Sequence, residues 1–274
     1  MLAAVVTVPA VEVELASDRL WSLGVAAIEE RHGRTSGEVE LWTSLGDDHA
    51  EAARALSQLP DRWTWRLMSI DVDVLDTWRL HVEPTWIADD LVIVPAWKPV
   101  PAPALADGVR SIAIDPGATF GMGDHPTTVL CVRCLQRVDQ RAARVLDVGC
   151  GSGVLSVAAC VLGAAEALAI DISAAAVPTT RANALRNDVA ARIAVSTTPL
   201  AEIDETFDTV VANILAPTLI DLADDLVRVL AGDGSLIISG VLADRHEHVL
   251  AALQPLRVTE TLVLDGWAAI ILRR

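Results

Sequence analysis

Three glycines and two acids form the group of residues whose types and spacing best suit ligand binding. The glycines are Gly149, Gly151 and Gly153, and they follow Asp147. Glycine has no Cβ, so a ligand can approach the bare backbone amides of such a loop where a helix begins. Asp171 lies about 20 residues further on, where a carboxylate can hold the two hydroxyls of a ribose. This spacing predicts a site for a nucleoside.

The spacing of the glycines bears on which nucleoside is bound. A dinucleotide-binding loop needs glycines at positions 149, 151 and 154, but Val154 occupies the last of these. The pattern that remains resembles the first motif of class I S-adenosylmethionine (SAM) methyltransferases, whose ligand carries no pyrophosphate. Glycine clusters alone are weak signals, so a tight turn in another doubly wound domain is the alternative. Asp171 counts against that alternative.

Two further groups of polar residues can contribute to such a site. Ser111 to Thr128 is dense in Gly, Pro, Asp and Thr, which favours a loop that makes specific contacts. The hydroxyls of Thr127 and Thr128 can cap the following helix or reach a bound ligand. Asn213 ends a later strand, and its amide, together with the backbone carbonyl of Ile214, can accept hydrogen bonds from an amine substrate. A plain strand-ending turn is the alternative for Asn213.

A series of apolar runs supplies the elements that must position these residues. Residues 145–148 suit a strand buried on both faces, and residues 154–162 suit a helix that Gly163 terminates. Because the glycine loop and the helix follow the strand directly, we predict the first turn of a Rossmann-like sheet. The other strands predicted for this sheet are 167–170, 208–212, 235–241, 257–264 and 267–272.

Residues 1–72 alternate between strand and helix patterns and contain no catalytic group of residues. Strands are predicted at 4–9, 38–45 and 63–72, and helices at 17–30, capped by Ser17, and at 47–59. This βαββα(β) pattern is that of a small ferredoxin-like α+β domain. Substrate recognition is the functional interpretation of the domain, and a structural or dimerisation module is the alternative.

A proline-rich stretch follows the first domain. Residues 73–110 contain Pro84, Pro95, Pro99, Pro101 and Pro103. Proline prevents a continuous helix, so we expect a surface connection between two domains here. The predicted organisation is a recognition domain over residues 1–72, a linker over 73–110 and a ligand-binding domain over 111–274.

Composition limits the partners. The chain has 274 residues, of which 52% are hydrophobic and 21% charged, as in globular proteins. Its net charge of −16 argues against nucleic acid, whose phosphates would be repelled, and favours a basic protein. A generally acidic, solvated surface is the alternative. No apolar stretch reaches membrane-spanning length and no basic segment precedes the first apolar run, so we expect a cytoplasmic protein without membrane contact.

The cysteines and histidines do not suggest a metal. Cys131 and Cys134 form a C-x-x-C inside a predicted helix, with no second pair at zinc spacing, so we interpret them as structural. His125 has no partners at metal-ligand spacing, and His246 and His248 form an isolated pair. We therefore predict that the chain binds no metal.

Four segments stand in the order and spacing of one known family. They are IDPGATFGMGDHPTT (114–128), VLDVGCGSGVLSVAACVLGA (145–164), AIDIS (169–173) and VVANILA (210–216). Through them the chain resembles the PrmA family, which methylates the eleventh protein of the large ribosomal subunit. The resemblance covers residues 76–274 well and the N-terminal domain in pattern only. It implies a class I SAM-dependent methyltransferase with a Rossmann-like seven-stranded sheet after the ferredoxin-like domain.

The resemblance also implies roles for particular residues. The SAM-binding positions of the family fall on Thr128, Gly149, Asp171 and Asn213, and the glycine argument adds Gly151. The loop over the methyl group contains Phe120, Gly121, Gly123 and His125. We predict His125 and Asn213 as catalytic residues. The family usually has threonines where this chain has Met122 and Asp124, and the N-terminal domain that would recognise the substrate is divergent.

The reaction implied is in-line attack of a neutral amine, a lysine side chain or an N-terminal amine, on the methyl group of SAM. Such a reaction needs alignment and a dry pocket more than a nucleophilic side chain. We expect SAM as cofactor, a ribosomal large-subunit protein as substrate and a monomeric enzyme. The alternatives are a methyltransferase of the same fold for another protein, a small molecule or a nucleic acid; an NAD-dependent oxidoreductase, which Val154 disfavours; and a noncatalytic SAM-binding protein.

Overall fold

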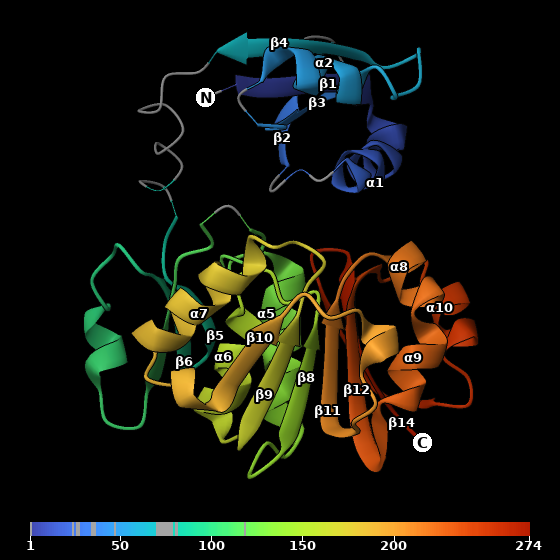
Figure 1. Ribbon diagram of the computed structural model, residues 1–274. Helices are drawn as coiled ribbons and strands as arrows, with labels where there is room; N and C mark the ends of the chain where they lie inside the picture. Colours follow the sequence, from blue (N-terminus) through green and yellow to red (C-terminus); the bar gives the residue numbers. More distant parts are fainter. Residues whose placement is uncertain are drawn as a thin grey trace. The chain divides into compact units, whose positions relative to one another are not determined.

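The computed structural model describes residues 2–23, 25, 28–33, 37–46, 48–69, 79, 82–117 and 119–274. The chain divides into two compact units, Met1–Val82 and Glu83–Arg274. Figure 1 shows the elements of each unit. In the part of the chain that is described, no helix is long and apolar enough to cross a membrane.

The described residues of the first unit form an antiparallel sheet of four strands in the order β2-β3-β1-β4, with two helices. Its elements are β1 (Leu2–Pro9), the 3-10 turn η1 (Ala10–Glu12), α1 (Val13–Ser22), β2 (Glu29–His32), β3 (Glu38–Thr43), α2 (His49–Leu56) and β4 (Thr64–Ser69). Alternate residues of β1, Ala4, Val6 and Val8, pack with Leu20 of α1 and Leu56 of α2. This order confirms the predicted ferredoxin-like domain.

The first helix of this unit differs from the prediction. We placed it at 17–30 with Ser17 as its cap, but α1 covers Val13–Ser22, so Ser17 lies in its interior. The reason is packing: Ala16 and Leu20, four residues apart, are both fully buried, and their face sets where the helix must begin. Residues 29 and 30, predicted as the end of the helix, instead begin strand β2, which pairs with β3.

The described residues of the second unit form a mixed sheet of seven strands in the order β10-β9-β8-β11-β12-β14-β13. Only the pairings made by β14 are antiparallel. The strands are β8 (Arg144–Val148), β9 (Glu166–Ile170), β10 (Ile193–Ser196), β11 (Phe207–Asn213), β12 (Leu230–Leu242), β13 (Arg257–Leu264) and β14 (Trp267–Arg273). Every strand predicted for this sheet lies within an observed strand. The sequence pattern did not locate β10.

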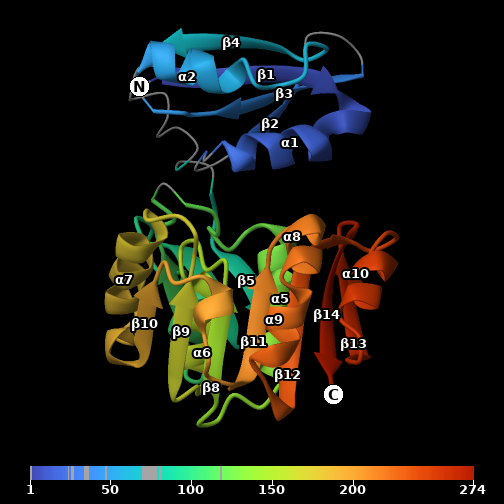
Figure 2. The ribbon, with the colours of Figure 1, turned by 45° about the vertical axis from the view of Figure 1, so that its right-hand side comes forward.

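Helices cover both faces of this sheet. They are α5 (Pro126–Arg137), α6 (Val154–Leu162), α7 (Ala176–Arg186), α8 (Ala216–Asp221), α9 (Ala223–Arg228) and α10 (Glu247–Ala252), with 3-10 turns η3 (Ala190–Arg192) and η4 (Leu200–Glu202). Successive strand residues enter opposite cores: Val145 packs on the side of α5 and α6, and Leu146 on the side of α8, α9 and α10. Figure 2 shows α9 in front of β12 and α5 behind the sheet.

Residues 83–110 are not a linker, and this prediction was wrong. They contain β5 (Thr85–Ala88), β6 (Leu91–Pro95) and the turn η2 (Ala102–Leu105), and they lead into β7 (Arg110–Ile114). Strand β6 is fully buried and pairs with β5 and β7 in a second sheet. Arg133 of α5 binds the carbonyl of Ile87 at 2.9 Å, which ties this sheet to the second unit. The prolines terminate short strands instead of marking a flexible connection. Residues 73–78 and 80–81 of the predicted linker lie outside the described residues.

Candidate active site

The glycine loop, residues 149–153, connects β8 to α6 as predicted. Its three glycines have positive φ, 75° at Gly149, 51° at Gly151 and 78° at Gly153, a conformation that side chains with a Cβ rarely adopt. The amides of Gly149 and Cys150 donate to the carbonyl of Ile170, at 2.9 and 3.1 Å. The loop is therefore fastened to the end of β9, next to Asp171.

The glycines also make room for other parts of the chain. A Cβ on Gly151 would lie 2.5 Å from the carbonyl oxygen of Phe120, and one on Gly149 would collide with the side chain of Ile214. A Cβ on Gly153 would lie 2.6 Å from a methyl group of Thr180. Because a Cβ does not approach another heavy atom this closely, each position excludes larger residues through its tertiary neighbours.

A second loop, residues 115–125, lies against the glycine loop, and we call it the covering loop. The amide of Ser152 donates to the carbonyl of Phe120 at 2.9 Å, and the Ser152 hydroxyl donates to the carbonyl of Gly121 at 2.6 Å. The two loops are thus joined through backbone groups. The sequence predicted a contact-making loop here, but it did not single out Ser152 as the residue that joins the loops.

A small pocket opens where the two loops meet. It is lined by Phe120, Gly121, Thr128, Gly149, Cys150, Val154, Leu155 and Asn213. Three of the predicted site residues, Thr128, Gly149 and Asn213, therefore come together from α5, the glycine loop and β11. The pocket lies at the carboxyl ends of the parallel strands, where ligands of such sheets bind. Cys150, Val154 and Leu155 add apolar surface that the sequence argument did not assign.

Thr128 contributes a buried hydroxyl to the wall of the pocket. Its side chain is fully buried in the first turn of α5, yet its hydroxyl has no hydrogen-bond partner among the described residues. Leaving a buried hydroxyl unpaired costs about 1 to 3 kcal/mol. Because Thr128 lines the pocket, a ligand bound there can supply the missing partner.

Asp171 follows β9 directly and has a second task beside the predicted one. One carboxylate oxygen accepts the amide of Gly151 at 2.8 Å, and the other accepts the amide of Ser173 at 2.8 Å. Each oxygen keeps a further lone pair for a ligand hydroxyl. The next residue, Ile172, is 99% exposed and offers an apolar surface beside the carboxylate. The sequence argument overlooked Ile172 because a single apolar residue after a strand has no distinctive pattern.

Asp147 lies beneath the glycine loop and is fully buried. Burial raises the pKa of its carboxyl to about 6, although hydrogen bonds from Ser156 oppose this shift. One oxygen of Asp147 accepts both the amide and the hydroxyl of Ser156, at 3.0 and 2.7 Å. This carboxyl therefore joins β8 to the first turns of α6 and holds the loop between them.

His125 is placed at the start of α5 and is not among the residues that line the pocket. Its Nδ1 accepts the amide of Thr127 at 3.3 Å, so the ring caps the helix. The ring packs edge-on between Phe120 and Trp267, with centroids 5.5 and 5.4 Å away. Burial lowers the pKa of His125, against the opposing charge of Asp124. The imidazole is therefore neutral near pH 7.

The positions where this chain departs from the family's usual threonines have different surroundings. Met122 packs against the core of the second unit, and Asp124 is exposed. Gly123, between them, has a φ of 110°, and a Cβ there would lie 2.5 Å from Ile93 of β6. The covering loop thus rests on the sheet that contains β6.

Asn213 ends β11 beside Ser239 of β12.

The carbonyl of Ile214 was predicted to face a substrate amine together with Asn213. In the structure this carbonyl lies against Gly240, whose φ is 84° and where any Cβ would collide with it. Cys131 and Cys134, interpreted as structural, are buried in α5 and free of disulfides.

The sheet order, the glycine loop, the acid after β9 and the pocket at the carboxyl edge define the class I methyltransferases. Within this class, the chain belongs to the family described as ribosomal protein L11 methyltransferase (PrmA), which matches residues 12–274. The match confirms the resemblance and extends it through most of the first unit.

Individual relatives agree. A ribosomal protein L11 methyltransferase of Symbiobacterium thermophilum is 40% identical over 256 residues, which cover 92% of this chain and 78% of the relative. Another, of Citrifermentans bemidjiense, is 41% identical over 208 residues, covering 74% of this chain and 67% of the relative. The crystal structure of a ribosomal protein L11 methylase from Lactobacillus delbrueckii subsp. bulgaricus superposes with a TM-score of 0.65 at 33% identity, covering 70% of this chain and 99% of that one.

Proposed function

We propose that this chain transfers methyl groups from SAM to amino groups of the ribosomal protein for which its relatives are named. The observation that carries the proposal is the pocket between the two loops, with the unpaired hydroxyl of Thr128 in its wall. The family and the sheet make the chain a SAM-dependent protein methyltransferase. We propose that the cofactor is held in this pocket.

The residues present suit SAM. Asp171 has lone pairs left for the ribose hydroxyls, and Thr128 needs a partner that a bound ligand can provide. Val154 and Leu155 supply apolar wall, and Gly149 contributes to the lining of the pocket. Among the residues that the structure describes, the lining of the pocket contains no lysine or arginine that could pair with a pyrophosphate, in agreement with Val154 at the third glycine position.

The chemistry depends on alignment and on a deprotonated acceptor. When bound, SAM supplies a methyl group on a positively charged sulfur. A lysine with a pKa of about 10.4 must lose its proton before it can attack, which costs about 4 to 5 kcal/mol at pH 7. The amide of Asn213, at the edge of the pocket, can accept a hydrogen bond from the amine and direct its lone pair at the methyl group.

We assign to the covering loop the role of excluding water from the pocket, and to His125 the role of positioning this loop. Ser152 fastens the loop at Phe120 and Gly121, both in the pocket wall. His125 uses Nδ1 as an acceptor for the helix, so its neutral ring carries the proton on Nε2 and is a poor base. The proton of the substrate amine then passes to water or to the exposed carboxylate of Asp124.

We assign recognition of the protein substrate to the first unit. One face of its sheet carries Trp42, with the guanidinium of Arg31 4.1 Å and that of Arg66 5.7 Å from its ring centroid. Glu40 accepts from both Arg66 and Trp42 on the same face. Aromatic and arginine side chains of this kind are the usual anchors of protein interfaces.

The test is an assay of methyl transfer from labelled SAM to the purified ribosomal protein. A panel of metabolites and the other ribosomal proteins, freed of RNA, are assayed in parallel. We expect label on amino groups of the one protein, located by mass spectrometry. The same protein isolated from a strain lacking this gene should be unmethylated. Transfer to a metabolite alone would contradict the proposal.

A further inference from the structure

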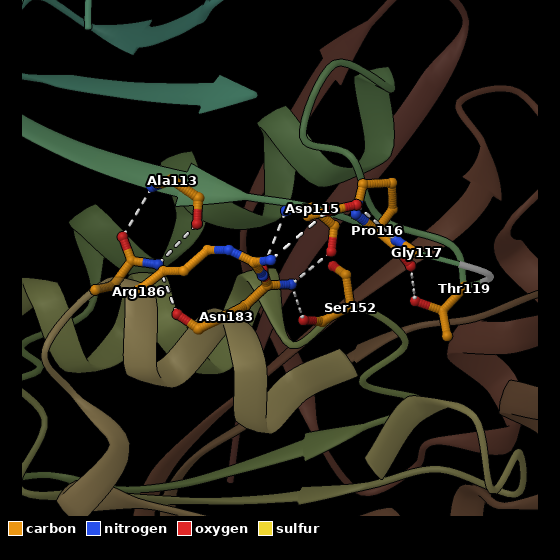
Figure 3. Close-up of polar contacts among 9 residues, drawn as sticks. Ala113, Asp115, Pro116, Gly117, Thr119, Ser152, Asn183 and Arg186 are labelled. Atoms are coloured by element: carbon orange, nitrogen blue, oxygen red, sulfur yellow. Dashed lines mark hydrogen bonds and ion pairs between the residues drawn. The ribbon is translucent and has the colours of Figure 1, made fainter. Parts of the chain in front are cut away.

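Asn183 of α7 and Asn187, the residue that caps its C-terminal end, bind the backbone of the segment that leads into the covering loop. Figure 3 shows Asn183 with its partners Asp115 and Ser152. The side-chain oxygen of Asn187 accepts the amide of Ala113 and its nitrogen donates to the carbonyl of Ala113, both at 2.8 Å. In the same way, the side-chain oxygen of Asn183 accepts the amide of Asp115 at 3.0 Å, and its nitrogen donates to the carbonyl of Asp115 at 2.9 Å. Each amide thus pairs with one residue as a neighbouring strand would.

The spacing of the two elements makes this pairing possible. Residues four apart on a helix are separated by about 6.0 Å along its axis, and residues two apart on a strand by about 6.6 Å. Ala113 and Asp115 therefore meet Asn187 and Asn183 in register. Strand β7 pairs with β6 along its other edge, so the two side chains close the edge that would otherwise be open.

Asn183 makes one contact that Asn187 does not. Its nitrogen also donates to the carbonyl of Ser152 in the glycine loop at 2.8 Å, and its oxygen also accepts from Arg186 at 2.8 Å. The side chain is fully buried, and all four of its hydrogen-bonding positions are used. The third bond of Asn187 goes back to the carbonyl of Asn183 within α7.

Ser152 connects this arrangement to the pocket. Its carbonyl is held by Asn183, while its amide and hydroxyl hold Phe120 and Gly121. Asn183 thus binds the start of the covering loop directly, through Asp115, and the far part of the same loop through Ser152. Phe120 and Gly121 form one wall of the pocket, and the glycine loop forms the other.

We propose that Asn183 is a positioning residue for methyl transfer: it couples the covering loop to the glycine loop and sets the width of the cofactor pocket between them. The inference rests on the proposed function only in taking this pocket as the SAM site. Asn187 holds the same strand without touching the glycine loop, so it separates positioning of the pocket from stability of the fold.

The test compares Asn183→Asp with Asn187→Asp in the full chain. Each substitution keeps the shape of the side chain and removes two donated hydrogen bonds to backbone carbonyls. We measure the midpoint of thermal unfolding and the calorimetric Kd of S-adenosylhomocysteine. Both variants should lose thermal stability, but Asn183→Asp should weaken the Kd by about tenfold or more and Asn187→Asp by no more than about twofold.

Equal effects of the two variants on Kd would overturn the inference, as would wild-type affinity in Asn183→Asp. If the aspartate variant of Asn183 does not fold, Asn183→Ser against Asn187→Ser takes its place, because serine leaves room for a water between the same groups. The expected results are unchanged.

A wild-type chain that binds no S-adenosylhomocysteine would contradict the proposed function but not the coupling. In that case, hydrogen exchange tests the coupling. Exchange of the Ser152 amide, which is bonded to Phe120, should quicken in Asn183→Asp and not in Asn187→Asp. Unchanged exchange in both variants would overturn the inference.

Discussion

Two glycines of the first unit and Gly151 of the second unit have opposite surroundings. Gly37 and Gly46 in the first unit have φ of 94° and 89°, and a Cβ on either would meet nothing within 4 Å. Gly151 also has positive φ, but a Cβ there would reach the Phe120 carbonyl at 2.5 Å. At positions 37 and 46 glycine serves only the backbone conformation. At position 151 it serves both the backbone conformation and the close approach of the covering loop.

The polar side chains differ in the same way. In the first unit they pair mainly with one another, as when Glu12 accepts from Arg62 at 2.8 Å and from Trp63 at 2.6 Å. Around the pocket they bind backbone, as Asn183 and Asp171 do. Backbone partners fix one geometry whatever the neighbouring side chains, whereas paired side chains can be exchanged together. Binding to the backbone therefore suits a chemical site, and pairing between side chains suits a surface that adapts to a partner.

The largest expected effect comes from Gly151→Val. The added side chain must displace Phe120 from the glycine loop, so SAM affinity should fall by about 100-fold or more, about 2.7 kcal/mol, as measured by calorimetry. The matched control is Gly37→Val, which also places a side chain at positive φ but in open space. It should bind SAM within about twofold of the wild type. Similar losses in the two variants would remove the contrast between the units.

The next effect concerns the division of labour between units. A chain reduced to residues 83–274 should bind SAM within about 1 kcal/mol of the full chain, because all the residues proposed to bind SAM belong to the second unit. If the first unit recognises the ribosomal protein, as we propose, methylation of that protein should fall on the order of 100-fold. Circular dichroism checks that the truncated chain is folded. Full activity of a folded, truncated chain on that protein would show that the first unit does not select the substrate.

Asp171→Ala should weaken SAM binding by about 1.5 to 3 kcal/mol, because a charged hydrogen-bond acceptor is lost. The carboxylate also holds the amides of Gly151 and Ser173, so loss of the loop must be separated from loss of the ribose contact. Calorimetry with a 2′-deoxy analogue of S-adenosylhomocysteine separates them. The penalty should shrink for the analogue if Asp171 binds the ribose. An equal loss of affinity for both ligands would show that Asp171 only holds the loop and does not bind the ribose.

The smallest effect is expected from Thr128→Val. If a ligand bonds the hydroxyl, SAM affinity should fall by about 1 kcal/mol, roughly fivefold, while thermal stability is kept or increased. Thr209 on β11 is the matched control, because its hydroxyl is also buried without a partner among the described residues but lies outside the pocket wall. Thr209→Val should leave calorimetric SAM affinity unchanged. Equal changes in affinity in Thr128→Val and Thr209→Val would show that the unpaired hydroxyl of Thr128 does not contribute to ligand binding.

Much of the second unit could be predicted from the sequence because its signals are local. Val145, Leu146 and Val148 are apolar without helical period, and burial on both faces of a parallel strand demands that pattern. The positive φ of Gly149, Gly151 and Gly153 likewise follows from residue type at a strand-to-helix turn. Thr128 and Asn213 could be placed at the pocket because both adjoin ends of predicted elements.

Other features were decided by the tertiary structure. The sequence of β6 is more apolar than that of β8, but Pro95 and the prolines that follow concealed that β6 pairs within the second unit. Ser17 looked like a helix cap until the burial of Ala16 and Leu20 placed it inside α1.

Asn183 shows most clearly what the sequence left undetermined. Its partners in the chain are 68 residues away at Asp115 and 31 residues away at Ser152. An asparagine in a helix has no local pattern that distinguishes an exposed side chain from one that joins two loops, because the difference lies in which backbone groups fold against it. Local chemistry therefore indicated six of the seven strands of the large sheet and the candidate nucleoside-binding residues, and long-range packing determined how the loops around them are held.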